Sequence, residues 1–277
     1  MSTDNFDKTL EDVRLSAHGL LPPQIYRKLF DIAYRSGGGT FVEIGTAHGA
    51  ATIALALGAQ ASQKPFHIYS VDPFSGRYSS RVKFGSVNAN VTFVLAQFEK
   101  YGVSKNIGLV VGECEDLLRS HRVDRVSVLF LDADGRIDRD LSHLFERLAP
   151  RCKIAIDDID DSLYVSKING LTVLDQKHRI GAAISKAFVA RDLLRLEAIV
   201  ENTGFYVKGD AQVTPDEIRL IALPAYRELV FAEIDFYDPA PSIAKRIWKF
   251  VRDRVQSASP LRRLVKKFRR STPSGCH

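Results

Sequence analysis

The stretch TFVEIGTAHGA at residues 40–50 decides the fold. Its apolar and β-branched first half is typical of a buried strand, and a turn at Gly45 leads into a helical pattern, ATIALALGAQ, at residues 51–60. Glycine lets the backbone approach a ligand closely, and free N–H groups at a helix start favour a carboxylate or phosphate. The stretch therefore predicts a strand, a turn and a helix around an anion-binding loop.

Outward from this stretch, strands alternate with helices. Further strands are predicted at residues 67–72, 106–112, 126–132 and 153–158. Few charges interrupt them, as in a sheet buried on both faces. Residues 195–210 predict a hairpin with a turn near 202–204. We expect an α/β fold with a doubly wound, mostly parallel, seven-stranded Rossmann-like sheet that ends in an antiparallel hairpin.

The remaining segments read as helices and one loop. Helices are predicted at residues 87–101, 179–194 and about 215–234. Residues 159–180 have little periodicity and follow the fifth strand, so a loop is expected there. Such a loop would be either a substrate lid or an ordinary surface connection.

Charge separates the chain into two parts. Residues 241–277 carry eleven Lys/Arg and one acid, whereas the chain as a whole has a net charge of only +6. We therefore predict a globular domain at residues 1–238 and a basic helical tail at residues 239–277, each with its own partners.

The expected cellular compartment follows from the spacing of the cysteines and from the hydrophobicity of the sequence. The three cysteines are far apart and form no C-x-x-C pair, which favours a reducing compartment. No apolar run of about 18 residues occurs, and the polar, acidic N-terminal stretch is unlike a signal peptide. A cytoplasmic protein is expected.

A nucleoside site is predicted at the carboxyl edge of the sheet. Asp72 ends the second strand, where an acid can accept hydrogen bonds from ribose hydroxyls. The turn after the first strand is E-x-G-x-x-x-G rather than the G-x-G-x-x-G that a pyrophosphate needs. This favours the monoanionic methionine end of S-adenosylmethionine over a dinucleotide.

With these motifs the chain resembles the class I S-adenosylmethionine-dependent methyltransferases, and among them the small-molecule O-methyltransferases related to catechol O-methyltransferase. FVEIGTAHG, SVD, LVVGECEDLL, VLFLDAD and IAIDD carry the resemblance over about residues 38–160, and it returns in the terminal hairpin. It implies that the methionine part lies at the first turn, the ribose at Asp72 and the adenine near Cys114. The cofactor-binding residues it implies are Glu43, Gly45, Thr46, Gly49, Asp72, Cys114, Glu115 and Asp132.

Three aspartates form a second group. Asp132 ends the fourth strand, and Asp157 and Asp158 end the fifth, so their carboxylates are expected to converge. Oxygen ligands suit Mg²⁺ or Ca²⁺. The resemblance implies a Mg²⁺ site that binds two adjacent substrate hydroxyls, with Asp158 where the family has Asn; the extra charge is expected to strengthen the metal's hold. Alternatively, Asp132 faces the methionine amine while Asp157 and Asp158 form a cap or turn.

The catalytic base departs from the family pattern. The family's lysine, three residues after the strand-four aspartate, maps to Gly135. Asp134 is the nearest alternative base, and His178 in the expected loop is a second. Asp132, Asp134 and His178 are thus the catalytic candidates. The D-A-D pattern at 132–134 is similar to metal-dependent sugar and antibiotic O-methyltransferases, so a small molecule or glycan with a vicinal diol is the expected acceptor.

Two rival functions remain. The basic tail would suit a nucleic-acid methyltransferase, but LDADG at residues 131–135 replaces the D/N-P-P-Y/F motif of base-methylating enzymes, so nucleic acid is disfavoured as a partner. A non-catalytic or oxidoreductase Rossmann protein is the second rival, because fold does not fix function. The oligomeric state is left open.

The tail itself predicts a membrane contact. Residues 241–270 contain two short stretches in which apolar residues at helical spacing alternate with Lys and Arg. Such basic amphipathic helices bind anionic lipid surfaces, which predicts a peripheral protein at the inner face of the membrane. Alternatively, the first stretch packs on the globular domain or on a partner subunit.

Overall fold

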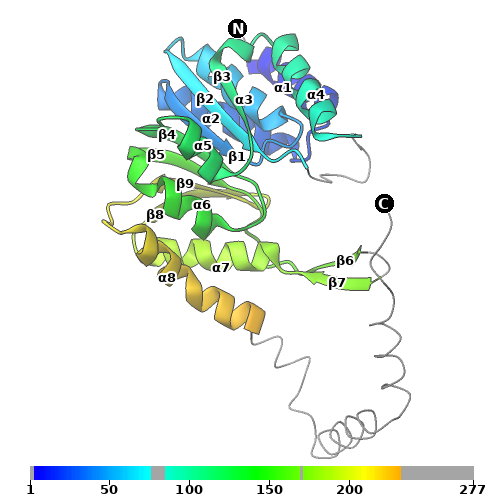
Figure 1. The fold of residues 1–277 in the computed structure, drawn as a ribbon. Coiled ribbons are helices and arrows are strands. Elements are labelled where there is room, and N and C mark those ends of the chain that lie inside the picture. The colour runs from blue at the N-terminus through cyan, green and yellow to red at the C-terminus, as the bar shows by residue number, and fades with distance from the viewer. Residues whose placement is uncertain (1–2, 76–84, 169–170, 232–277) are drawn as a thin grey trace, which may run out of the picture. The chain divides into compact units, whose positions relative to one another are not determined.

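The computed structural model describes residues 3–75, 85–168 and 171–231 (Figure 1). Its described residues form a seven-stranded sheet in the order β3-β2-β1-β4-β5-β9-β8. The strands are β1 (Gly39–Ile44), β2 (Phe66–Asp72), β3 (Ile107–Val111), β4 (Val126–Leu131), β5 (Leu148–Ile156), β8 (Leu194–Val200) and β9 (Thr203–Lys208). Pairs among β1 to β5 are parallel, and β9 is antiparallel to β5 and β8. The predicted fold class is confirmed.

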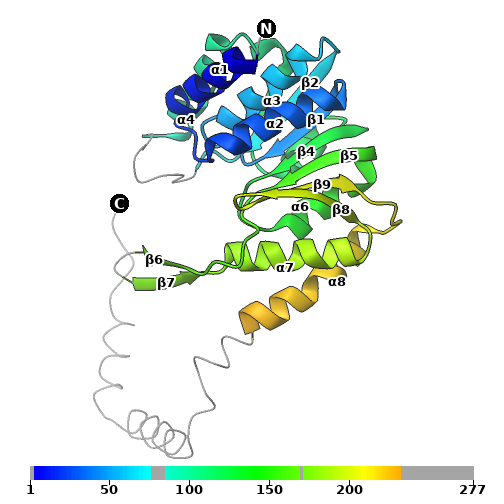
Figure 2. The ribbon, with the colours of Figure 1, turned by 180° about the vertical axis from the view of Figure 1, so that it is seen from behind.

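Helices cover both faces of the sheet (Figures 1 and 2). One face carries α1 (Thr3–Ser16), α2 (Pro23–Ser36), α3 (Ala50–Ala61) and α4 (Val87–Lys100). The other carries α5 (Cys114–Ser120), α6 (Ile137–Leu144), α7 (Lys177–Ala190) and α8 (Pro215–Tyr226). Single turns lie at Ser104–Asn106, Phe145–Arg147 and, after α8, Arg227–Phe231. The sheet is therefore the middle layer of three.

Alternation along the strands builds the two cores. Phe41 and Phe130 are fully buried on the α1–α4 side, whereas Val42 and Leu131 are buried on the α5–α8 side. Successive strand residues point to opposite faces, so continuous apolar strands fill both layers. The strands contain few charged residues because both of their faces are buried.

Helix starts follow local capping chemistry. Thr214 accepts a hydrogen bond from the backbone N–H of Glu217, whose carboxylate accepts one from the backbone N–H of Thr214, and Pro215 is the first residue of α8. This capping box satisfies N–H groups that the helix itself cannot.

The prediction of a loop at residues 159–180 is wrong, because the segment contains two strands and the start of a helix. Tyr164–Ile168 (β6) and Leu171–Asp175 (β7) pair in antiparallel register, and α7 already begins at Lys177. The sequence between the two strands, Asn169-Gly170, is a strong signal for a two-residue hairpin turn. The segment is short of helical periodicity because it is a hairpin; its role as a lid stays a prediction.

The predicted tail lies outside the described residues. The chain divides after Leu229 into a first unit, Met1–Leu229, and a second that starts at Val230. The boundary at residue 238, the tail at 239–277 and the helices at 241–270 therefore stay predictions. Among the helices within residues 3–231 that the structure describes, none is both long and apolar enough to span a lipid bilayer.

Candidate active site

A cavity of about 530 Å³ lies at the carboxyl edge of the sheet. Its lining includes residues at the carboxyl ends of five parallel strands: Asp72 is the last residue of β2, and Gly45, Gly112, Asp132 and Asp157 come directly after the other four. Strands β1 and β4 are neighbours, yet the chain leaves β1 for α3 on one face and β4 for α6 on the other. Open α/β sheets bind ligands in the crevice at such a switch point.

Gly45 is required by close packing at this edge. Its φ is +101°, and a Cβ there would overlap the backbone carbonyl of Asp132. The N–H of Asp132 in turn donates to the carbonyl of Ile44, 2.9 Å away. The turn after β1 therefore lies flat against the end of β4 and exposes its backbone to the cavity.

Asp72 lines the cavity with a carboxylate held by backbone donors. The N–H of Ala47 donates to Oδ2 at 2.9 Å, and the N–H of Phe74 donates to Oδ1 at 2.6 Å. These two backbone donors orient the Asp72 carboxylate at the cavity wall. Its contact with ribose hydroxyls stays a prediction.

Glu43 lies beside the cavity, in the core. Its side chain is fully buried and is not part of the cavity lining; the hydroxyls of Thr52 and Ser70 donate to its Oε2, the latter at 2.8 Å. Burial raises the pKa of Glu43 to about 7, against the opposite effect of these hydrogen bonds. The carboxylate binds hydroxyl groups of the core beneath the cavity. Its contact with a cofactor stays a prediction.

Two further predicted residues of the turn also lie away from the cavity wall. Thr46 is buried and shares a hydrogen bond of 2.6 Å with Ser70. Gly49 is the N-cap of α3 with φ +87°, where a Cβ would meet the ring of Phe98 at 2.9 Å. Both residues shape the turn that Gly45 begins.

The end of β3 supplies the opposite wall. Cys114 is buried and lines the cavity, and burial raises the pKa of its thiol to about 12. Glu113 lines the cavity as the N-cap of α5. Glu115 is outside the lining and pairs with His143 of α6 at 2.9 Å, because the first turn of α5 points it toward that helix. Glu113 rather than the predicted Glu115 therefore lines the cavity, and a contact of Glu115 with adenine stays a prediction.

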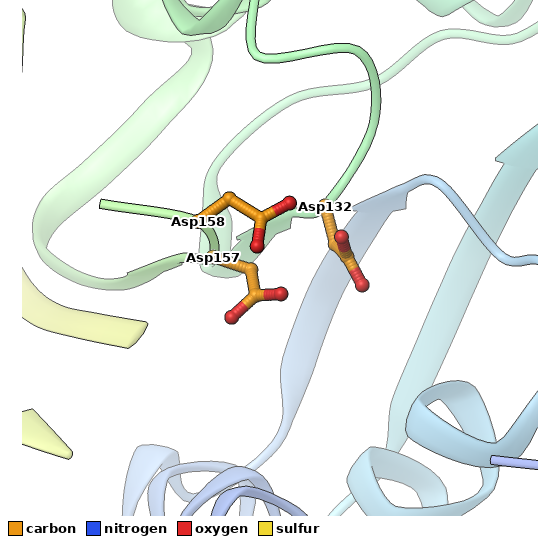
Figure 3. A group of neighbouring side chains, drawn as sticks. All are labelled: Asp132, Asp157 and Asp158. Atoms are coloured by element: carbon orange, nitrogen blue, oxygen red, sulfur yellow. The ribbon is translucent and has the colours of Figure 1, made fainter. Parts of the chain in front are cut away.

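Asp132, Asp157 and Asp158 meet as predicted (Figure 3). One carboxylate oxygen of each lies within 4.8 Å of the others. Asp157 continues the β4–β5 ladder, with its N–H bonded to the carbonyl of Leu131 at 3.0 Å. Burial and the neighbouring Asp157 raise the pKa of Asp132 well above its usual range, and burial raises that of Asp157 to about 6. The three acids are costly to ionise together unless a cation is present.

The turn of the terminal hairpin and the start of α7 hold this group. Thr203 donates a hydrogen bond to Oδ1 of Asp157, and the amide of Asn202 donates to Oδ1 of Asp158 at 2.9 Å. The ammonium of Lys177 lies 2.6 Å from Oδ2 of Asp158. Burial alone would lower the pKa of Lys177, but Asp158 and Asp132 outweigh it, so its pKa lies above the usual value.

Residues 42–159 match the model of a family described as a methyltransferase domain. Over this stretch the chain is similar to a methyltransferase domain. The matched residues run from β1 to just beyond β5 and contain both the turn at Gly45 and the three aspartates. The class suspected from the sequence is confirmed at this level. No protein with a curated description matches the chain.

Solved structures agree with the methyltransferase fold. An O-methyltransferase from Bacillus cereus in complex with SAH shares 16% identity over 73% of this chain and 90% of that chain, with a TM-score of 0.51. The O-methyltransferase TomG from Streptomyces achromogenes, in complex with SAM, shares 15% identity over 72% and 89%, with a TM-score of 0.50. Cofactor-bound Rv0187 from MTB shares 16% identity over 72% and 88%, with a TM-score of 0.53. Similarity at this level of identity establishes the fold.

Of the three catalytic candidates, Asp132 and Asp134 line the cavity and His178 does not. Asp134 is engaged by the guanidinium of Arg139, with N–O distances of 3.0 and 3.2 Å. His178 lies on α7 rather than in a loop, with Nε2 2.9 Å from Asp158 and Nδ1 3.2 Å from Asp160. Neither alternative base is therefore a free acceptor facing the cavity.

Sequence reasoning missed several residues of the cavity. It found no lysine near Gly135, yet Lys177 reaches this place from α7. Leu20, Leu21 and Pro22, between α1 and α2, form an apolar wall. Lys177 lies in the polar segment after the predicted fifth strand, so the sequence places it near the carboxyl edge of the sheet. The sequence does not show that α7 begins at Lys177, and this helix start directs the side chain toward the aspartates. No signal pointed to residues 20–22.

Proposed function

We propose that the chain is an S-adenosylmethionine-dependent methyltransferase that acts on a hydroxyl oxygen of a small molecule. One observation carries the proposal: a single cavity is lined both by the Gly45 turn, Asp72 and Cys114, which we assign as its cofactor end, and by three carboxylates, which we assign as its acceptor end. Two similar solved structures, an O-methyltransferase in complex with SAH and another in complex with SAM, support the choice of cofactor and of oxygen as the atom that is methylated.

The residues divide the work by chemistry. The exposed backbone at Gly45 suits the methionine carboxylate, Asp72 the ribose hydroxyls, and the apolar surface beside Cys114 the adenine. Leu20, Leu21 and Pro22 would cover an apolar part of the acceptor and exclude water from the reacting atoms. Methyl transfer needs an acceptor oxygen aligned with the sulfonium methyl more than a covalent intermediate, so positioning by these walls is the main contribution.

A divalent cation fits the donor set of the acceptor end. Three carboxylates with oxygens within 4.8 Å of one another provide the hard oxygen ligands that Mg²⁺ prefers. We propose that Asp132, Asp157 and Asp158 hold it, with Thr203 and Asn202 fixing two of the carboxylates. A bound cation would supply an acidified acceptor hydroxyl. A small molecule or glycan with adjacent hydroxyls is the acceptor that this arrangement favours.

Two measurements test the proposal. Calorimetric titration with S-adenosylhomocysteine, compared with NAD, separates a methyltransferase from an oxidoreductase; binding of NAD alone would contradict it. Methyl transfer to a panel of catechols, vicinal-diol sugars and matched mono-ols, with and without EDTA, then tests the acceptor and the metal. Undiminished transfer in excess EDTA would leave a metal-free methyltransferase.

We also propose, from sequence alone, that residues 241–270 dock on an anionic lipid surface, where a lipid-linked glycan would meet the enzyme. Each cation near such a surface adds about 1 kcal/mol of attraction at low screening. Flotation with vesicles of phosphatidylcholine, with or without anionic phosphatidylserine, compares the full chain with one that ends at Asp238. Equal flotation of the two chains would remove the lipid surface as a partner.

A further inference from the structure

Lys177 places a permanent cation inside the acceptor end of the cavity. It is the first residue of α7, lines the cavity, and lies with Nζ 2.6 Å from Oδ2 of Asp158. Its side chain is 24% exposed and that of Asp158 17%, so water screens this pair less than a surface ion pair. The contact is therefore part of the site.

Gly135 makes room for this lysine. A Cβ at Gly135 would lie 2.6 Å from Cγ of Lys177, and the φ of Gly135 is +79°. The loop after β4 thus has no side chain where the aliphatic part of Lys177 passes. A larger residue at position 135 would require the Lys177 side chain to shift from its observed path.

Asp158 is the carboxylate that the start of α7 surrounds. Lys177 contacts Oδ2, while His178, the next residue of the same helix, lies with Nε2 2.9 Å from Oδ1. Asp158 has a φ of +56°, which aspartate tolerates better than most residues, and this directs its side chain toward α7. The extra charge expected to strengthen a metal's hold is therefore already balanced by the protein itself.

We propose that Lys177 is a built-in cation that competes with a divalent metal for Asp158 and so sets the metal affinity of the site. The inference rests on the proposed function, because it concerns the carboxylates assigned to the metal. An ammonium at Asp158 reduces the negative charge that attracts a divalent cation and occupies one of its ligand oxygens. A metal bound through all three carboxylates would have to displace this ammonium from Asp158 or share the carboxylate with it. Lys177 is thus a positioning residue for the acceptor end.

Mn²⁺ binding to the full chain, without cofactor or acceptor, tests this competition. We expect Lys177→Gln and Lys177→Met to bind Mn²⁺ at least tenfold more tightly than the original chain, measured by calorimetry and by the loss of the free-ion electron paramagnetic resonance signal. Lys177→Arg keeps the charge and should restore the weaker affinity. Lys186→Gln, an exposed lysine of the same helix, is the matched control and should change nothing.

The outcomes separate this inference from the proposed function. S-adenosylhomocysteine binding and circular dichroism show that each variant is folded, and they test the cofactor end on their own. If the folded neutral variants bind Mn²⁺ no more tightly than the original chain, or do not bind it at all, the competition is overturned while the methyltransferase assignment stands. If Lys177→Arg gains affinity as much as Lys177→Gln does, lost packing rather than lost charge is the cause, and the inference fails.

Discussion

Two parts of the cavity lining are held in place by different kinds of contact. The proposed cofactor end is fixed by backbone: the Gly45 turn lies against Asp132, and the N–H groups of Ala47 and Phe74 hold Asp72. The acceptor end is fixed by charged and polar side chains, with Lys177 and the hairpin turn holding Asp157 and Asp158. Substitutions that alter the backbone should therefore disrupt the proposed cofactor end most. Substitutions that alter charge should change ligand binding most at the proposed acceptor end.

Gly45→Ala should give the largest effect and test the backbone half of this comparison. A Cβ at φ +101° overlaps the carbonyl of Asp132, so we expect roughly 3–5 kcal/mol of lost unfolding free energy and no measurable S-adenosylhomocysteine binding. Chemical denaturation and calorimetry measure both. Gly102→Ala is the control, because its φ is +67° with open space around it; it should lose only about 1–2 kcal/mol and keep the ligand. Similar losses in both would refute the packing argument.

Glu43→Gln tests the support beneath the cofactor end through pH. Burial raises the pKa of Glu43 from 4.5 to about 7, so the folded protein holds this proton more tightly than the unfolded chain does. The unfolding free energy therefore falls as pH rises from about 4.5 to 7, and the loss is complete above 7. We expect Glu43→Gln to remove this fall and to be more stable than the original chain by about 2–3 kcal/mol at pH 8, with little difference at pH 4. Parallel stability curves for the two proteins would contradict the prediction.

Asp72→Asn should weaken the cofactor end without affecting the acceptor end. The variant loses the charged acceptor for ribose hydroxyls, so S-adenosylhomocysteine affinity should fall by about 1–3 kcal/mol, the usual value of a charged hydrogen bond. Calorimetry gives this number, and Mn²⁺ binding, expected to be unchanged, is the internal control. An unchanged affinity for S-adenosylhomocysteine in the folded variant would remove Asp72 from the cofactor site.

Asp134→Asn should give the smallest effect and sharpen the division within the acceptor end. Arg139 already engages both oxygens of Asp134, whose side chain is 55% exposed, so we expect activity to fall by less than about fivefold. Asp132→Asn, in the carboxylate group, should lose at least about a hundredfold. Steady-state rates with one acceptor compare them. A loss at Asp134 as large as that at Asp132 would restore Asp134 as the base.

The sequence was sufficient where one local pattern determines one element. The five parallel strands and the convergence of Asp132 with Asp157 and Asp158 follow from apolar runs and from the rule that parallel strands end at one edge. Glu43 and Glu115 show the limit, because spacing places a residue near a site but does not decide toward which side its carboxylate turns. Lys177 shows another, since its partner Asp158 becomes a neighbour only through the tertiary fold.

Because β9 pairs with β5 but comes much later in the chain, the two parts of the cavity lining are synthesised at different times. The strands and turns of the cofactor end are complete in the chain once β4 has been made, but Asp157 waits for Thr203, 46 residues later, to reach it from the hairpin turn. At ordinary rates of synthesis this interval is on the order of a few seconds. In a growing chain, the residues of the proposed acceptor end are therefore the last of the two sets to be synthesised.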